Sequence, residues 1–85
     1  MNNNLSLYNI FLAVAEAGST LGAAKTLFIS QPAVSKAISK LEASLEVSLF
    51  VRSKKGVRLT DDGLILYDRI KNAFEYIDEG ESVIR

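Results

Sequence analysis

Residues 27–45, LFISQPAVSKAISKLEASL, decide how the rest of the chain is interpreted. Ser30 is a favourable N-cap, because its hydroxyl can accept from a free backbone N–H in the first turn of a following helix. Pro32 falls in that first turn, where the missing N–H of proline breaks no hydrogen bond. The stretch therefore predicts a helix over residues 31–45, preceded by a break of three residues at 28–30.

This central helix has two different faces. Its apolar side chains recur every three or four residues and form one stripe that should face a core: Val34, Ile38, Leu41 and Leu45. Another face carries short or polar side chains and one long cation: Gln31, Pro32, Ser35, Lys36 and Ser39. A helix that is apolar behind and small, polar and cationic in front suits the major groove of DNA.

The amino-acid composition excludes several kinds of site. The chain has 85 residues, which suits one small domain, and it contains neither cysteine nor histidine. A disulfide framework, a thiolate metal site and the commonest general base are therefore absent, and we expect neither a metal nor a cofactor. Because no signal peptide and no membrane-spanning apolar run is recognisable, we expect a soluble, intracellular protein.

Charge is distributed unevenly although the formal net charge is zero. Residues 25–58 hold seven lysines and arginines against two glutamates, a net charge of +5, whereas residues 59–85 have a net charge of −4. A basic middle beside an acidic tail indicates a nucleic-acid partner for the middle. The alternative is ordinary solvated charge, with the acidic residues folded back near the basic ones.

The residues before the central stretch predict two more helices, the first of them over residues 5–17. Ser19 or Thr20 is expected to cap the second helix. Only three residues then precede the central helix, which is the spacing of a helix-turn-helix motif. At this turn we expect Phe28 and Ile29 to plug the core.

Signals for helix ends recur along the chain. Asn3 or Asn4 suits the cap of the first helix, and Thr60 suits the cap of the last one. Gly18 suits the end of the first helix, where a left-handed backbone costs glycine little. Glu46 stands at the equivalent position after the central helix, so we expect a left-handed glutamate there, at a cost of roughly 1–2 kcal/mol.

A hairpin is expected after the central helix. Residues 49–52 and 57–59 predict two short strands, joined by a turn at residues 53–56. Residues 52–58 of this hairpin contain four cations: Arg52, Lys54, Lys55 and Arg58. We interpret the hairpin as a wing that lies against phosphates or enters a minor groove. The alternative is a charged edge that resists aggregation.

The last helix is expected from residue 61 to near the C-terminus. A helix of 25 residues is about 37 Å long, which is further than so small a body can cover. We therefore expect its apolar seam to bind a second copy of the chain, the alternative being that the seam packs wholly on the first helix, and we expect each to hold for a different portion of the seam. The residues expected at the dimer interface are Leu66, Tyr67, Ile70, Ala73, Phe74, Ile77 and Ile84.

Together these features resemble the N-terminal DNA-binding domain of LysR-type transcriptional regulators. The similarity covers nearly the whole chain and is carried by Ala23-Ala24, Leu27, SQPAVS at 30–35, Ile38, Leu41-Glu42, Leu45, Val47, Leu49-Phe50, Arg52, Gly56-Val57, Leu59-Thr60 and Gly63. The resemblance implies a bacterial, cytoplasmic regulator with a mainly α winged helix-turn-helix over residues 1–60 and a linker or dimerisation helix over residues 61–85. It also implies that the chain is part of a longer regulator, whose C-terminal domain would bind a small-molecule effector, the alternative being a natural stand-alone domain.

The resemblance and the chemistry of the side chains together predict which residues contact DNA. These are Gln31, Pro32, Ala33, Ser35, Lys36, Ser39, Lys40, Arg52, Lys54, Lys55 and Arg58. Gln31 is the best candidate for reading a base, because its amide can both donate and accept at an adenine edge. Lys36 is expected to reach a guanine or a phosphate, whereas the other lysines and arginines are expected mainly to neutralise phosphates. The two-fold symmetry of a homodimer implies an interrupted palindrome in double-stranded DNA.

The sequence departs from the family pattern at the start of the second helix. Thr20-Leu21-Gly22 stands where the family frequently has Phe-Thr-Arg. This change removes a polar cap and a cation near the phosphates, so the resemblance predicts no particular contact from that helix end.

Two other classes of function are compatible with parts of the sequence. A protein-interaction winged helix would use the acidic, apolar last helix as its binding surface, but it has no need of cations on both the central helix and the hairpin. An enzyme is not expected, because the neighbours Ser35 and Lys36 point in different directions on a helix and do not form a catalytic pair. The chain also lacks a glycine loop that could cradle phosphates.

Overall fold

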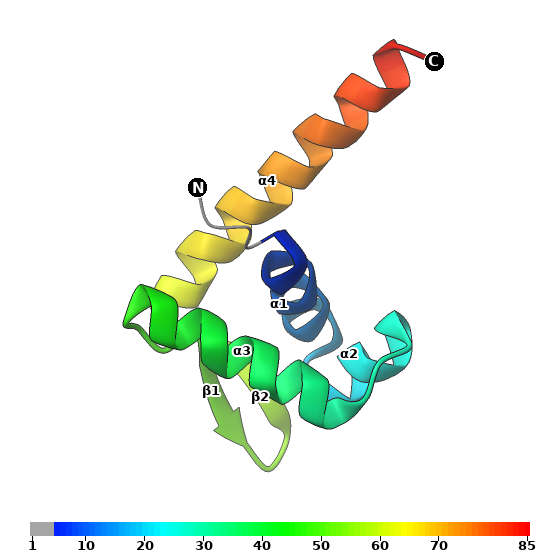
Figure 1. Cartoon of the computed structure of the whole chain (residues 1–85). Helices are drawn as coiled ribbons and strands as arrows, with labels where there is room; N and C mark the ends of the chain where they lie inside the picture. The colour runs from blue at the N-terminus through cyan, green and yellow to red at the C-terminus, as the bar shows by residue number, and fades with distance from the viewer. Residues whose placement is uncertain (1–4) are drawn as a thin grey trace.

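The computed structural model describes residues 5–85, so the cap expected at Asn3 or Asn4 lies outside the described residues. The elements are α1 (Leu5–Ala17), α2 (Thr20–Leu27), α3 (Gln31–Leu45), β1 (Phe50–Ser53), β2 (Gly56–Leu59) and α4 (Asp61–Val83). Figure 1 shows α1, α2 and α3 gathered into a body, with the antiparallel hairpin β1–β2 beside α3. This arrangement is the predicted winged helix-turn-helix. No helix among residues 5–85 is long and apolar enough to cross a membrane.

The core lies where α1, α2, α3 and the first half of α4 meet. Its buried apolar side chains are Phe11, Val14, Ala23, Ala24, Val34, Ile38, Leu41, Leu49 and Ile70. The stripe predicted on α3 is thus buried from Val34 to Leu41, whereas Leu45 at the end of the helix is 40% exposed. Burial of these side chains, worth about 1.5–3 kcal/mol for each one larger than alanine, holds the helices together.

The helix ends follow local chemistry. Ser30 caps α3 by accepting from the backbone N–H of Ala33 at 3.2 Å, and Thr60 caps α4. Ser19 rather than Thr20 caps α2. Gly18 has a φ of 71° and Glu46 a φ of 57°, which confirms the two expected left-handed positions.

The expectation that Phe28 and Ile29 plug the core is wrong. Phe28 is the left-handed C-cap of α2, with a φ of 58°, and its backbone N–H donates to the carbonyl of Ala24. The helix ends there, and the ring is 94% exposed to solvent. Ile29 is 38% exposed, so neither side chain contributes fully to the core.

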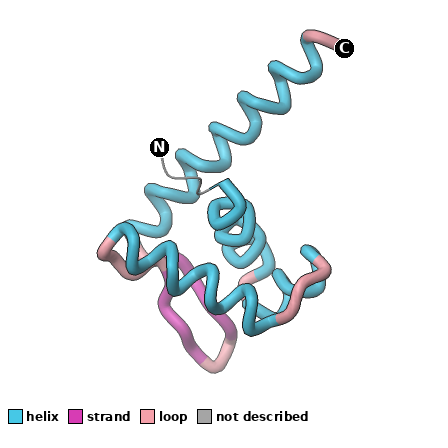
Figure 2. The backbone as a smooth tube through the Cα atoms, in the orientation of Figure 1, coloured by secondary structure: helices cyan, strands magenta, loops and turns pink. Residues whose placement is uncertain are grey.

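α4 packs on the body along the part of the helix that ends at Phe74. Ile70 is 6% exposed and belongs to the core, and Leu66, Tyr67 and Phe74 pack against that core. Ile70 is therefore removed from the set of residues available to a second copy of the chain, because its own chain already covers it. Beyond this point α4 continues to Val83, as one uninterrupted helix in Figure 2.

Candidate nucleic-acid interface

The face of α3 opposite the core is free. Because Val34, Ile38 and Leu41 are buried, the other sides of the helix are turned to solvent. The predicted contact residues of α3 that are exposed are Gln31, Pro32, Ala33, Lys36, Ser39 and Lys40, and Ser35 is half-buried. None of them lies inside the folded body.

The wing presents the four predicted cations to solvent. Val51 pairs with Arg58 and Arg52 with Val57, so the two-residue tip is Lys54-Lys55. Arg52, Lys54, Lys55 and Arg58 are all exposed. The strands are displaced slightly from the expected ranges, because Leu49 is buried in the core and strand pairing begins at Phe50.

Two contacts hold the wing against the body. At one of them the backbone N–H of Val57 donates to the carbonyl of Gly18 at 3.0 Å. Gly56 has a φ of 120°, and a Cβ on it would overlap the same carbonyl oxygen of Gly18. The wing therefore packs directly on the tight turn after α1. Only glycine, which has no side chain, fits at position 56.

The second contact joins α3 to β1. The carboxylate of Glu42 accepts from the backbone N–H of Leu49 at 2.6 Å and from that of Phe50 at 3.3 Å. The sequence pattern identified Glu42 only as a charged residue and as part of the LysR-like motif. That motif was the available signal that Glu42 has a specific role. Glu42 thus connects α3 to the start of the wing through two hydrogen bonds.

A hollow of about 220 Å³ lies where the start of α2, the start of α3 and the wing meet. It is lined by Ser19, Thr20, Leu21, Gln31, Arg52, Ser53, Gly56 and Val57. Gln31 of the central helix and Arg52 of the wing thus border one surface depression, although they are far apart in the sequence. Nε2 of Gln31 donates to Oγ1 of Thr20 at 3.0 Å, a contact that sequence reasoning did not predict.

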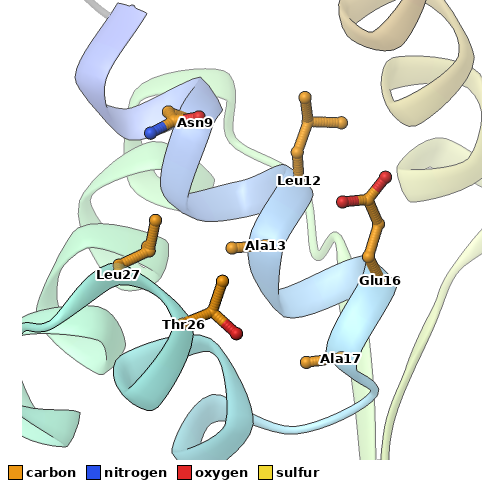
Figure 3. A pocket seen from close by; sticks show the side chains of 7 residues that line it. All are labelled: Asn9, Leu12, Ala13, Glu16, Ala17, Thr26 and Leu27. Atoms are coloured by element: carbon orange, nitrogen blue, oxygen red, sulfur yellow. The ribbon is translucent and has the colours of Figure 1, made fainter.

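A larger hollow of about 420 Å³ lies between α1 and α2 (Figure 3). Its lining residues are Asn9, Leu12, Ala13, Glu16, Ala17, Thr26 and Leu27. None of them was predicted to bind DNA, and none is a cation. This hollow is therefore separate from the candidate interface.

The acidic residues of the distal half of α4 are not folded back over the basic part of the chain. The distal half of α4 leads away from the body and from the hairpin (Figure 1). It carries Glu75, Asp78, Glu79 and Glu81. The cations of α3 and of the wing consequently remain free to attract an anionic partner.

Comparison with known proteins places this architecture among transcriptional regulators. A family described as bacterial regulatory helix-turn-helix protein, lysR family, matches residues 5–64. The uncharacterised HTH-type transcriptional regulator YoaU of Bacillus subtilis is 52% identical over 61 residues, which are 71% of this chain and 21% of that protein. An uncharacterised HTH-type transcriptional regulator of Mycobacterium bovis is 40% identical over 75 residues, 88% of this chain and 24% of that protein. The chain therefore spans about a quarter or less of the length of these relatives.

Solved structures agree with the sequence matches. CbnR, a LysR family transcriptional regulator, has a TM-score of 0.86 at 34% identity, over 100% of this chain and 29% of that chain. The DNA complex of the CbnR DNA-binding domain has a TM-score of 0.83 at 34% identity and covers 100% of both chains. The complex of the BenM DNA-binding domain with catB site 1 DNA has a TM-score of 0.89 at 31% identity, over 99% of this chain and 92% of that chain. The predicted family resemblance and the winged helix-turn-helix architecture are thereby confirmed.

Proposed function

Since this chain belongs to the lysR family of bacterial regulatory helix-turn-helix proteins, we propose that it binds duplex DNA sequence-specifically and regulates transcription. The observation that carries the proposal is the hollow bordered by both Gln31 and Arg52, which joins the central helix to the wing in one outward-facing surface. DNA complexes of two structural neighbours support the same partner.

In this proposal α3 enters the major groove. Gln31 reads a base, and Ser35 and Ser39 bond to bases or phosphates. Pro32 and Ala33 offer apolar contact to a thymine methyl group. Lys36 reaches a guanine or a phosphate.

The remaining cations neutralise phosphates along the backbone or in the minor groove. These are Lys40 on α3 and Arg52, Lys54, Lys55 and Arg58 on the wing. Such contacts add affinity for any DNA sequence and carry little sequence information themselves.

A homodimer completes the proposal. The distal half of α4 and the Ile84 that follows it leave Tyr76, Ile77, Val83 and Ile84 exposed to water in a single chain. A second copy of α4 would cover these side chains and place two reading helices on an interrupted palindrome. The interface predicted here comprises the exposed Ala73, Ile77 and Ile84, with Leu66, Tyr67 and Phe74 at its edge.

Two substitutions test the proposed division between reading and affinity. Gln31→Ala should cost about 1–3 kcal/mol at one base pair of the preferred sequence and leave binding to random duplex unchanged. Lys54→Ala should weaken binding to both DNAs alike and reduce the slope of log K against log salt by about one unit. Fluorescence anisotropy titrations at several salt concentrations measure both, on a preferred sequence obtained by selection from random duplexes.

The opposite outcomes have definite meanings. Equal losses on the preferred and the random duplex for Gln31→Ala would remove this residue from the reading role. A chain that fails to shift random duplex even at low salt would instead favour the protein-interaction module, with α4 as its binding surface.

A further inference from the structure

The side-chain amide of Gln31, an exposed residue, donates a hydrogen bond to the hydroxyl of Thr20, a buried residue of the preceding helix. Thr20 lies at the first position of α2 and is 8% exposed, the one buried polar residue found in the described part of the chain. Its Oγ1 accepts from Nε2 of Gln31 at 3.0 Å. The contact therefore connects the first residue of α2 to the first residue of α3, across the turn of the helix-turn-helix.

Thr20 is not needed at this position to cap α2. Ser19 performs that role, because its hydroxyl accepts from the backbone N–H of Gly22 at 2.9 Å. The hydroxyl of Thr20 is thus free to hold the side chain of Gln31. Both residues also line the hollow that α3 shares with the wing.

The contact leaves Gln31 able to read DNA. A glutamine amide has two N–H donors and one carbonyl acceptor. Thr20 engages one donor, so the other N–H and the carbonyl oxygen stay available. One donor and one acceptor are what an adenine edge requires in the major groove.

We infer that Thr20 is a positioning residue, whose hydroxyl holds the amide of Gln31 in the orientation that reads one base pair. A free glutamine on the surface loses considerable rotamer entropy when it is immobilised on DNA. A glutamine already held by Thr20 loses less, so part of that cost falls on folding and not on binding. The inference rests on the reading role that we propose for Gln31.

A pair of matched variants tests the inference. Thr20→Val removes the hydroxyl and keeps the branched shape, whereas Thr20→Ser keeps the hydroxyl. Thr20→Val should lower affinity for the preferred duplex about fivefold, with an equal loss of discrimination at the base pair read by Gln31, because a rotamer-rich side chain is no longer held. Binding to random duplex should not change, and Thr20→Ser should stay within about twofold of the parent chain on both DNAs.

A double variant separates positioning from a merely structural role. In the Gln31→Ala background, Thr20→Val should cause no further loss, because the side chain that Thr20 holds is gone. The NMR signals of the Gln31 side-chain amide give a second readout without DNA, and they should shift in Thr20→Val but not in Thr20→Ser. If Thr20→Val unfolds the chain, Thr20→Ala removes the same oxygen atom and replaces it in every measurement.

Three results would overturn the inference. They are no loss for Thr20→Val, equal losses on preferred and random duplexes, and an undiminished loss in the Gln31→Ala background. In each of them Gln31→Ala by itself can still lose discrimination at one base pair, which leaves the proposed function intact. A Gln31→Ala variant that keeps full discrimination at every base pair would remove the reading role and, with it, the inference.

Discussion

The helices α3 and α4 both carry an apolar stripe, but their own chain covers the two stripes to different extents. On α3 the stripe from Val34 to Leu41 is buried. On α4 Ile70 is 6% exposed, whereas Ile77, two turns further along the same seam, is 48% exposed, and Ile84, which follows the end of the helix, is 84% exposed. The comparison shows that apolar residues at helical spacing identify a face suited to burial. This spacing does not identify which element or chain buries that face.

The uncovered faces differ in chemistry as well. The free face of α3 has small polar groups and lysines, and the wing beside it adds four cations. The distal half of α4 combines acidic side chains with exposed apolar ones. A polyanion is attracted to the first surface and repelled by the second, so DNA suits α3 and another protein chain suits α4.

The largest expected effect contrasts one glycine of the wing, Gly56, with one glycine of the distal half of α4, Gly80. Gly56→Ala should destabilise the chain by roughly 4 kcal/mol, because it combines a strained φ with overlap on the Gly18 carbonyl. Gly80→Ala should stabilise it by up to about 1 kcal/mol, because the helix gains a better former and an added Cβ meets nothing within 4 Å. Urea unfolding followed by circular dichroism measures both.

Equal changes in unfolding free energy for Gly56→Ala and Gly80→Ala would contradict the contrast between the two positions. A neutral Gly56→Ala would mean that the wing does not sit on the turn after α1. A destabilising Gly80→Ala would mean that this part of α4 packs closely against something in solution.

The next largest effect compares two isoleucines of the same seam. Ile70→Ala should cost about 2–5 kcal/mol of unfolding free energy, because it leaves a cavity between α4 and the body. Ile77→Ala should change the stability of the isolated chain by less than about 0.5 kcal/mol. It should nevertheless raise the dimer dissociation constant about tenfold, because the side chain is exposed until a second chain covers it.

Sedimentation of both variants over a range of protein concentrations measures the dimer dissociation constants, and urea unfolding measures the unfolding free energies. Unchanged association of the Ile77 variant would exclude the exposed part of the seam as the interface. A larger loss of monomer stability for Ile77→Ala than for Ile70→Ala would contradict the inference that only the part of α4 around Ile70 packs on the body.

The smallest effect concerns the end of α3. Glu46→Gly should raise stability by about 1 kcal/mol, because glycine adopts a φ of 57° without the cost that a side chain brings. Ala43→Gly, at an exposed position inside the same helix, should lower stability by about 1 kcal/mol and serves as the matched control. Thermal unfolding should show melting temperatures displaced in opposite directions, and a lower melting temperature for Glu46→Gly would contradict the left-handed cap.

Features that depend on neighbours in the sequence could be predicted. The cap at Ser30, the left-handed positions at Gly18 and Glu46 and the hairpin all arise from interactions over a few residues, and the structure has each of them. The exposed face of α3 also followed from its period. For the candidate site, this was sufficient to list the side chains of α3 that face solvent, with the exception of the half-buried Ser35.

Features that depend on distant pairs could not be predicted. The contact of Thr20 with Gln31, the carboxylate of Glu42 on the strand and the seat of Gly56 on Gly18 each join separate elements. The exposed ring of Phe28 was wrongly assigned to the core, because an apolar residue at a turn has no local signal that tells inside from outside.

The amino-acid sequence by itself determined the elements, their order, the caps at Ser30 and Thr60 and the basic character of the middle of the chain, since each of these follows from local propensity and charge. Only the tertiary structure decided which half of the α4 seam its own chain buries, and which polar groups of α2 and the wing lie beside Gln31. The physical reason is that burial and hydrogen bonding between separate elements depend on distances in space, which no period along the chain encodes.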